Sequence, residues 1–111
     1  MTDTPTVVIR FKDVEHDETL RDDLERRTRE LASEFPETTR FELSLEPDGT
    51  GFRIHGHVNG KDTQVPVHGQ GADVRSAADQ LFHRLRQQLR RVHDKRIFQL
   101  RKEAQKSGPK H

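Results

Sequence analysis

The amino-acid sequence predicts an α+β fold, a β-α-β-β-β-α two-layer sandwich in which a four-stranded sheet carries two helices packed on one face. Four segments alternate apolar and polar residues, as half-buried strands do. Two longer segments repeat apolar residues at intervals of three and four, as amphipathic helices do. Of the 111 residues, 29% are hydrophobic and 35% are charged, so we expect a thin core that covers only one face of the sheet. The length fits one domain.

The first strand and the first helix are read from residues 6–35. Residues 6–12 alternate and predict a strand. Asp17 is a plausible N-cap of a helix that runs to about Phe35, and Pro36 then ends this helix. The apolar stripe of the helix consists of Leu20, Leu24, Leu31 and Phe35. Acid-before-base spacing at i,i+4 predicts three ion pairs on the opposite face, namely Asp22–Arg26, Asp23–Arg27 and Glu25–Arg29.

The next three strands are expected to form a meander of hairpins after a right-handed first crossover. Residues 41–46 and 52–58 alternate, and the Pro/Gly-containing segment 47–51 is a turn between them. Asn59-Gly60 is the strongest short hairpin signal. Pro66 lies within the weaker last strand, which predicts a position at the edge of the sheet, where a missing N–H does no harm.

A long second helix follows residues 69–71, a Gly-Gln-Gly segment that we expect to be flexible. Asp73 can serve as its N-cap. Its apolar residues are Val74, Ala77, Ala78, Leu81, Phe82, Leu85, Leu89 and Val92. The helix matches the length of the sheet by about His93, and if it continues towards Gln105, a further ~18 Å must project past the sheet.

The charge distribution is strongly polarised, although the net charge is only +1. Residues 1–49 carry seven Lys/Arg and fourteen Asp/Glu, whereas residues 84–111 carry ten Lys/Arg and two acids. This asymmetry suggests a polyanionic partner for the basic end, with nucleic acid as the first candidate, and the alternative is a solvated helix face with a basic tail. We divide the chain into an α+β domain of residues 1–96 and a basic helical extension and tail of residues 97–111.

Several classes of protein are disfavoured by what the sequence lacks. There is no cysteine, and no apolar run approaches the roughly 20 residues that cross a bilayer. The N-terminus lacks the apolar centre of a signal peptide, so we expect a cytoplasmic protein without a membrane partner. Trp and Tyr are absent and most of the six Phe fit the core, which predicts recognition of nucleic-acid backbone and shape rather than base sequence.

The second helix carries the residues best suited to nucleic acid. The planar, weakly hydrated guanidinium of arginine matches phosphate oxygens. The cations that lie among the apolar positions of this helix are Arg84, Arg86, Arg90, Arg91, Lys95 and Arg96.

Motifs over about residues 6–96 carry a family resemblance. One is the hairpin segment His57-Val58-Asn59-Gly60, and another is the helix pattern D-x-x-x-A-x-D-x-L-x-x-x-L-x-x-x-L that begins at Asp73. Further matching residues are Val14, Glu15, Leu20, Arg21, Leu31, Phe35, Gln88, Asp94 and Lys95. With this element order, the chain resembles a short form of the ribosome hibernation promoting factor family, also called the ribosome-associated translation inhibitor or sigma-factor modulation family.

The resemblance implies binding to the small ribosomal subunit in the channel used by mRNA and by the A- and P-site tRNAs. Such proteins block initiation and keep idle ribosomes dormant. The chain ends without the extra C-terminal domain by which long members pair ribosomes, so we expect no pairing of ribosomes by this chain alone. The expected protein is a non-enzymatic translation inhibitor that needs no cofactor, is a monomer when free, and has the small ribosomal subunit and its rRNA as partners.

The resemblance also assigns residues. The basic positions of the family's second helix fall on Arg84, Arg91 and Lys95, and one of its first helix falls on Arg27. Gln87 and His93 stand where Lys or Arg is common, and neighbouring arginines can compensate. The predicted rRNA-binding residues are Arg27, Arg84, Arg86, Arg90, Arg91, Lys95 and Arg96. Because the first helix is acidic, we expect the second helix to make the main contact.

Two other functions are weighed against this one. The first is a non-catalytic protein-interaction module whose acidic helix or sheet edge binds a protein while the basic tail only keeps it soluble. The second is a histidine metalloprotein, because His55, His57 and His68 can share one sheet surface. No cysteine supports a metal site, and a supporting contact with RNA suits these histidines better, so we predict none. No acid–base pair or phosphate-binding loop indicates an enzyme.

Overall fold

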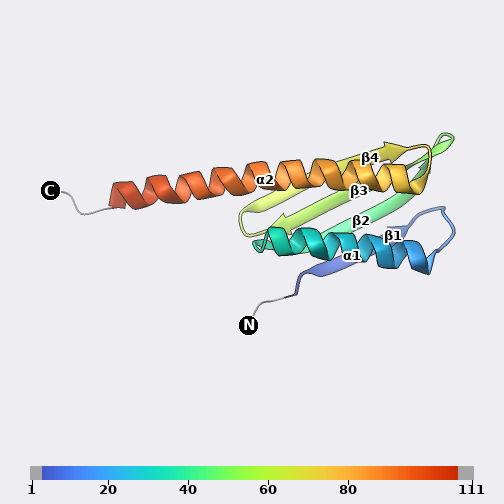
Figure 1. Ribbon diagram of the computed structural model, residues 1–111, viewed down its shortest axis with the longest axis horizontal. Coiled ribbons are helices and arrows are strands. Elements are labelled where there is room, and N and C mark those ends of the chain that lie inside the picture. The colour runs from blue at the N-terminus through green and yellow to red at the C-terminus, as the bar shows by residue number, and fades with distance from the viewer. Residues whose placement is uncertain (1–3, 108–111) are drawn as a thin grey trace.

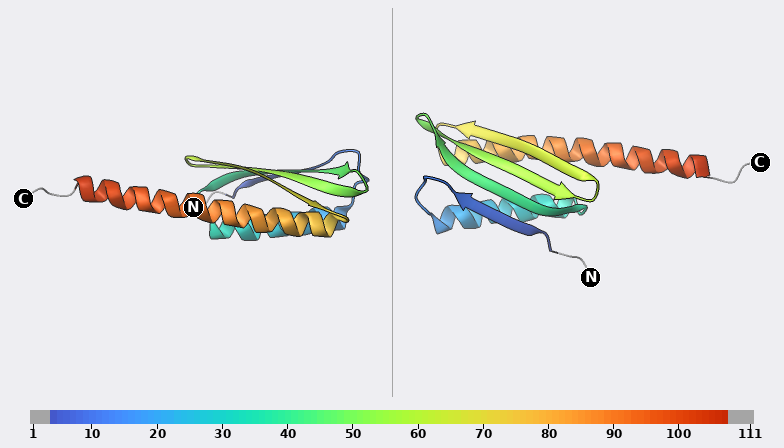
Figure 2. Two further views of the ribbon diagram at one scale, coloured as in Figure 1. Left: turned by 90° about the horizontal axis from the view of Figure 1, so that it is seen from above. Right: turned by 180° about the vertical axis from the view of Figure 1, so that it is seen from behind.

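The computed structural model describes residues 4–107 of the chain, with side chains described as far as residue 103. Its elements are β1 (Thr6–Phe11), α1 (Glu18–Glu34), β2 (Thr38–Asp48), β3 (Gly51–Gly60), β4 (Thr63–Gly71) and α2 (Val74–Ser107). The strands form one sheet in the order β1-β2-β3-β4, with β1 parallel to β2 and the other neighbours antiparallel. Both helices cover the same face of this sheet, and the opposite face is open (Figures 1 and 2). The predicted fold class is confirmed.

The core lies between the sheet and the two helices. Its largest fully buried side chains are Leu24 from α1, Phe41, Leu43 and Leu45 from β2, Ile54 and Val58 from β3, and Leu81, Leu85 and Leu89 from α2. The apolar stripe predicted for each helix is therefore the stripe that packs on the sheet. Burial of one such leucine contributes roughly 1.5–3 kcal/mol, and truncation to alanine removes more because a cavity remains.

Helix α1 begins at its predicted cap. The Asp17 carboxylate accepts a hydrogen bond from the Leu20 backbone N–H at 3.2 Å, and the helix ends at Phe35. One buried residue escaped the apolar pattern, because Thr28 is fully buried within the stripe. Its hydroxyl donates to the Leu24 carbonyl at 2.7 Å, so the polar group costs little there.

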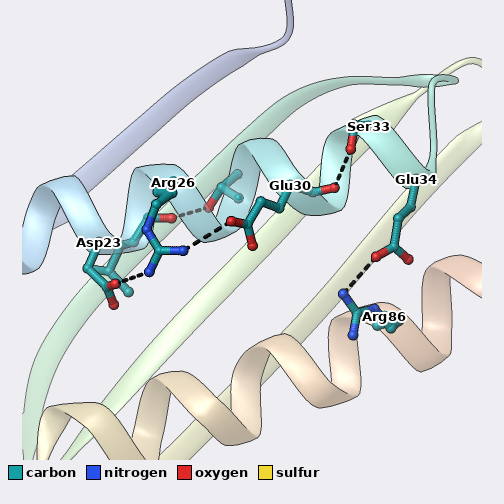
Figure 3. A network of polar contacts seen from close by, with 8 residues as sticks. Asp23, Arg26, Glu30, Ser33, Glu34 and Arg86 are labelled. Carbon is teal, nitrogen blue, oxygen red and sulfur yellow. Dashed lines mark hydrogen bonds and ion pairs between the residues drawn. The ribbon is translucent and has the colours of Figure 1, made fainter.

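The ion pairs on α1 differ from the predicted set. Only the pair of Arg29 with Glu25 forms as expected, at 2.9 Å. Arg26 pairs with Asp23 and Glu30 rather than with Asp22 (Figure 3). Long arginine side chains reach both i−3 and i+4, so spacing alone does not select one acid.

The β3–β4 turn lies two residues beyond the predicted position. Asn59 and Gly60 still belong to β3, and Lys61-Asp62 forms the turn, with Asp62 at φ 56°. Gly60 is required for a different reason, because a Cβ there would overlap the Glu37 carbonyl, which accepts from the Lys61 N–H at 3.1 Å. Pro66 lies on β4 at the edge of the sheet, as predicted.

The segment predicted to be flexible is instead the end of β4. Gly69 and Gly71 face the first turns of α2, whose backbone lies directly against them. A Cβ on Gly69 would lie 2.5 Å from the Leu81 backbone nitrogen, and one on Gly71 would lie 2.6 Å from that of Ala77. The glycines therefore permit close approach between a helix and a strand, rather than mobility.

Asp73 caps α2, and its titration gives the first prediction. The Ser76 backbone N–H donates to the Asp73 carboxylate at 2.7 Å, and this bond, with one from the Ser76 side chain, lowers the pKa of Asp73. A lowered folded-state pKa means that the cap stabilises the fold at neutral pH and loses this effect as pH falls through that pKa. Asp73→Asn should melt close to wild type at neutral pH, because Asn caps about as well, and should lose less stability in acid. Thermal melts followed by circular dichroism test this, and parallel pH curves for the two proteins would contradict it.

Candidate nucleic-acid interface

Three sides of helix α2 contact or face other parts of the protein. One side packs on the sheet through its leucines. A second side faces α1 and the loop that follows it, where Phe82, Arg86 and His93 make their contacts. A third side faces the edge strand β4, where the Arg84 guanidinium donates to the His68 carbonyl at 3.0 Å. The remaining direction points to solvent, away from both α1 and the sheet.

A row of exposed residues runs along α2 on the side of Arg84. We call Arg84, Arg91, Lys95, Phe98 and Lys102 the outer stripe. Their spacing of seven, four, three and four residues places them on one helix face. All five are exposed, and within residues 4–103 no ion pair engages Arg91 or Lys95. Arg91 and Lys95 are therefore available to an external anion, and Arg84 is exposed although it donates to the His68 carbonyl.

Two predicted contact residues, Arg27 and Arg86, form ion pairs within the protein. The Arg27 guanidinium lies 3.0 Å from the Asp79 carboxylate and 4.6 Å from the centre of the Phe82 ring, so it joins α1 to α2. Arg86 pairs with Glu34 of α1 at 2.8 Å (Figure 3). The predicted Asp23–Arg27 pair is wrong for this reason, since Arg27 turns towards the acid on α2.

Arg90 and Arg96 complete the predicted set. Arg90 is exposed and has no ion pair among the described residues. Arg96 is half-buried and lines a shallow groove of about 610 Å³, shared with Lys61 of the β3–β4 turn and with Leu100. Six of the seven predicted residues thus lie on α2, on more than one side of the helix, and Arg27 of α1 lines a pocket together with Arg86.

The C-terminal part of α2 projects past the sheet. His93 attaches this helix to the body near the end of the sheet, because its Nδ1 lies 2.8 Å from Glu37 and its ring packs edge-on against Phe35. We call residues 94–107 the arm. It continues the helix without a break beyond the end of the sheet (Figure 1), and the molecule measures 65 × 30 × 16 Å. The projection expected from the length comparison is present.

The three histidines considered as metal ligands, His55, His57 and His68, lie on the open face of the sheet. Cross-strand register places Arg10, Ser44, His55 and His68 in one row, and the rings of His55 and His68 lie 6.4 Å apart. His55 Nε2 lies 2.8 Å from Glu46. Among the described residues no three His, Cys, Asp or Glu side chains are arranged to hold a metal ion. The histidine metalloprotein alternative therefore gains no support.

Phe98 is the residue that sequence reasoning did not single out. The other five phenylalanines are buried in the core or packed against it, as expected for most of them. Phe98 is 67% exposed. The sequence did indicate this exposure. The second helix is longer than the sheet, so an apolar residue beyond His93 has no sheet to cover it.

The fold and the basic α2 surface define a small α+β protein with an anion-accessible helix. Neither described helix has the length and apolar character of a membrane-spanning segment. Residues 7–97 match the family model described as sigma 54 modulation protein / S30EA ribosomal protein, and the chain belongs to this ribosome-associated family. The resemblance seen in the sequence is confirmed.

Solved structures agree in fold. A ribosomal subunit interface protein from Coxiella burnetii is 15% identical, with a TM-score of 0.75 over 80% of this chain and 98% of that one. The N-terminal domain of Protein Y from Thermus thermophilus is 21% identical, with a TM-score of 0.70 over 79% and 98% of the respective chains. No curated protein matches the sequence.

Proposed function

We propose that the protein binds the rRNA of the small ribosomal subunit in the channel used by mRNA and tRNA, and that it silences idle ribosomes by occlusion. The outer stripe carries this proposal. It places exposed cations in a row on the helix that leaves the body, in a member of a ribosome-associated family. Guanidinium and ammonium groups in such a row suit the regularly spaced phosphates of an RNA strand.

The mechanism requires no catalytic group. A folded body that occupies the channel excludes mRNA and tRNA because two molecules cannot fill the same volume. Affinity then comes from ion contacts and the release of counterions. We therefore propose a non-enzymatic cytoplasmic protein, monomeric when free, in which residues 1–96 form the ribosome-binding domain and residues 97–111 extend it.

The contacts are ranked by availability. Arg84, Arg91 and Lys95 come first, because they match the family pattern and are exposed. Arg90 and Arg96 come next, on neighbouring faces of the same helix. Arg27 and Arg86 rank last, since contact with rRNA requires each to exchange or share the carboxylate it already holds.

Sedimentation with purified small subunits tests the proposal. At low salt the protein should sediment with the subunits, and affinity should fall about a thousandfold between roughly 50 and 200 mM salt if about six phosphates are contacted. Prior loading of the subunits with mRNA and initiator tRNA should block binding, because the ligands share one channel. Protein that stays in the ribosome-free fractions at low salt, or that binds loaded and empty subunits equally, would overturn the proposal.

A further inference from the structure

The exposed ring of Phe98 is unexplained by the fold. It lies on the arm, at the first position beyond the segment that matches the family model. Two other apolar residues of the arm, Ile97 and Leu100, are 37% and 50% exposed, both less than Phe98. They lie one and two positions away in sequence, so they project from other sides of the helix.

Three of the four residues that lie about one helical turn from Phe98 are cations, namely Lys95, Arg101 and Lys102, and the fourth is Asp94. Lys95 precedes it by three residues and Lys102 follows it by four, so the ring lies between two ammonium groups with Cβ atoms about 5–6 Å away on either side. Arg91 continues the same face one turn closer to the body. An aromatic ring flanked by cations fits a nucleotide, whose base stacks while its phosphates pair.

A protein partner fits this face less well. Apolar anchors of protein interfaces lie in clusters that exclude water, with a polar rim around them. Phe98 has no apolar neighbour on the outer stripe, whose other members are all charged. A single ring among cations offers a platform for one flat ligand rather than the centre of an apolar patch.

We propose that Phe98 stacks on an unpaired nucleobase of RNA while Lys95 and Lys102 contact the phosphates beside that nucleotide. The inference rests on the proposed binding to rRNA and adds a single-stranded or bulged nucleotide to its target. It also revises the expectation that recognition is of backbone and shape alone. Stacking tolerates every base, so the contact selects unpaired nucleotides rather than a sequence.

Three substitutions of Phe98 separate stacking from apolar contact. Phe98→Trp should bind small subunits at least as well as wild type, whereas Phe98→Leu and Phe98→Ala should bind about five- to a hundredfold more weakly. None changes the charge, so the slope of affinity against salt concentration should stay unchanged. The ring is exposed, so all three variants should keep the wild-type melting temperature, and that measurement serves as the folding control.

Fluorescence gives a direct readout, because the chain has no Trp and no Tyr. The indole of Phe98→Trp should be quenched by a hairpin RNA with one bulged nucleotide and much less by a fully paired hairpin of the same length. Leu100→Trp places the same reporter on another side of the arm and should respond little to either RNA. Equal quenching of both reporters would overturn the assignment to the outer stripe.

The outcomes also separate this inference from the proposed function. If wild type and Phe98→Ala bind small subunits equally, the stacking role is wrong and the proposed function stands. If Phe98→Leu binds like wild type while Phe98→Ala is weakened, the ring is an apolar anchor and stacking is again wrong. If wild type does not bind small subunits, both proposals fail together.

Discussion

Reversing the charge of Arg84, Arg90, Arg91 and Lys95 to glutamate should abolish binding to the small ribosomal subunit at moderate salt. Each substitution removes an ion contact with phosphate and adds a repelling carboxylate. With about 1 kcal/mol or more lost at each site, the affinity should fall on the order of a thousandfold. All four residues are exposed, and only Arg84 makes a hydrogen bond to the body, so the fold should survive. Filter binding or sedimentation measures the loss.

A matched control changes the net charge equally on other surfaces. Arg26 and Arg29 lie on α1, and Arg40 and Arg53 come from β2 and β3. Their combined replacement by glutamate should weaken binding far less, once thermal melts show that both variants remain folded. An equal loss in the control would mean that net charge, rather than the α2 surface, governs binding. Binding that survives the α2 reversal would favour a protein-interaction module with a solubilising tail.

The fold was predictable because each element shows its own period in the sequence. Alternation of apolar and polar residues predicted the strands, and apolar residues at intervals of three and four predicted the helices that cover them. The position at which α2 ceases to pack on the sheet was also predictable, because the length of the sheet follows from the number of residues in its strands. His93 lies at that position. Close backbone approach was not predictable. Gly60 and Gly69 read as turn and linker residues, although both are needed where another chain segment touches a strand.

The residues of the candidate site could be predicted from the sequence, but the ion pairs that some of them form could not. The basic character of α2 and the family-matched positions followed from the sequence. The partner of Arg27 did not, because Asp79 lies far away in the chain and becomes its neighbour only when α1 and α2 pack together. Within one helix several acids were in reach of each arginine, so spacing gave candidates rather than a choice. The exposure of Phe98 could be predicted only once the helix was known to extend past the sheet.

The largest predicted effect on stability comes from Gly69→Ala. The added methyl group would meet backbone atoms of α2, including the Leu81 nitrogen at 2.5 Å, and backbone cannot rotate away as a side chain can. The helix must move off β4, which opens the core around Leu81 and Leu85. We expect a loss of about 3 kcal/mol or more in the free energy of unfolding, at the upper end of overpacking substitutions. Urea denaturation followed by circular dichroism measures it.

Gly56→Ala is the control that isolates backbone contact as the cause. Gly56 lies on the adjacent strand and faces the same helix, but its nearest neighbours are side-chain ends, with Leu81 Cδ1 at 3.1 Å and Leu43 Cδ2 at 3.4 Å. These methyl groups can shift by a few tenths of an ångström, so its cost should be about 1 kcal/mol or less. Both substitutions restrict the unfolded chain equally, so that effect cancels in the comparison. Equal stability of the two variants would show that α2 can slide on β4, and would contradict the role assigned to Gly69 in seating the basic helix.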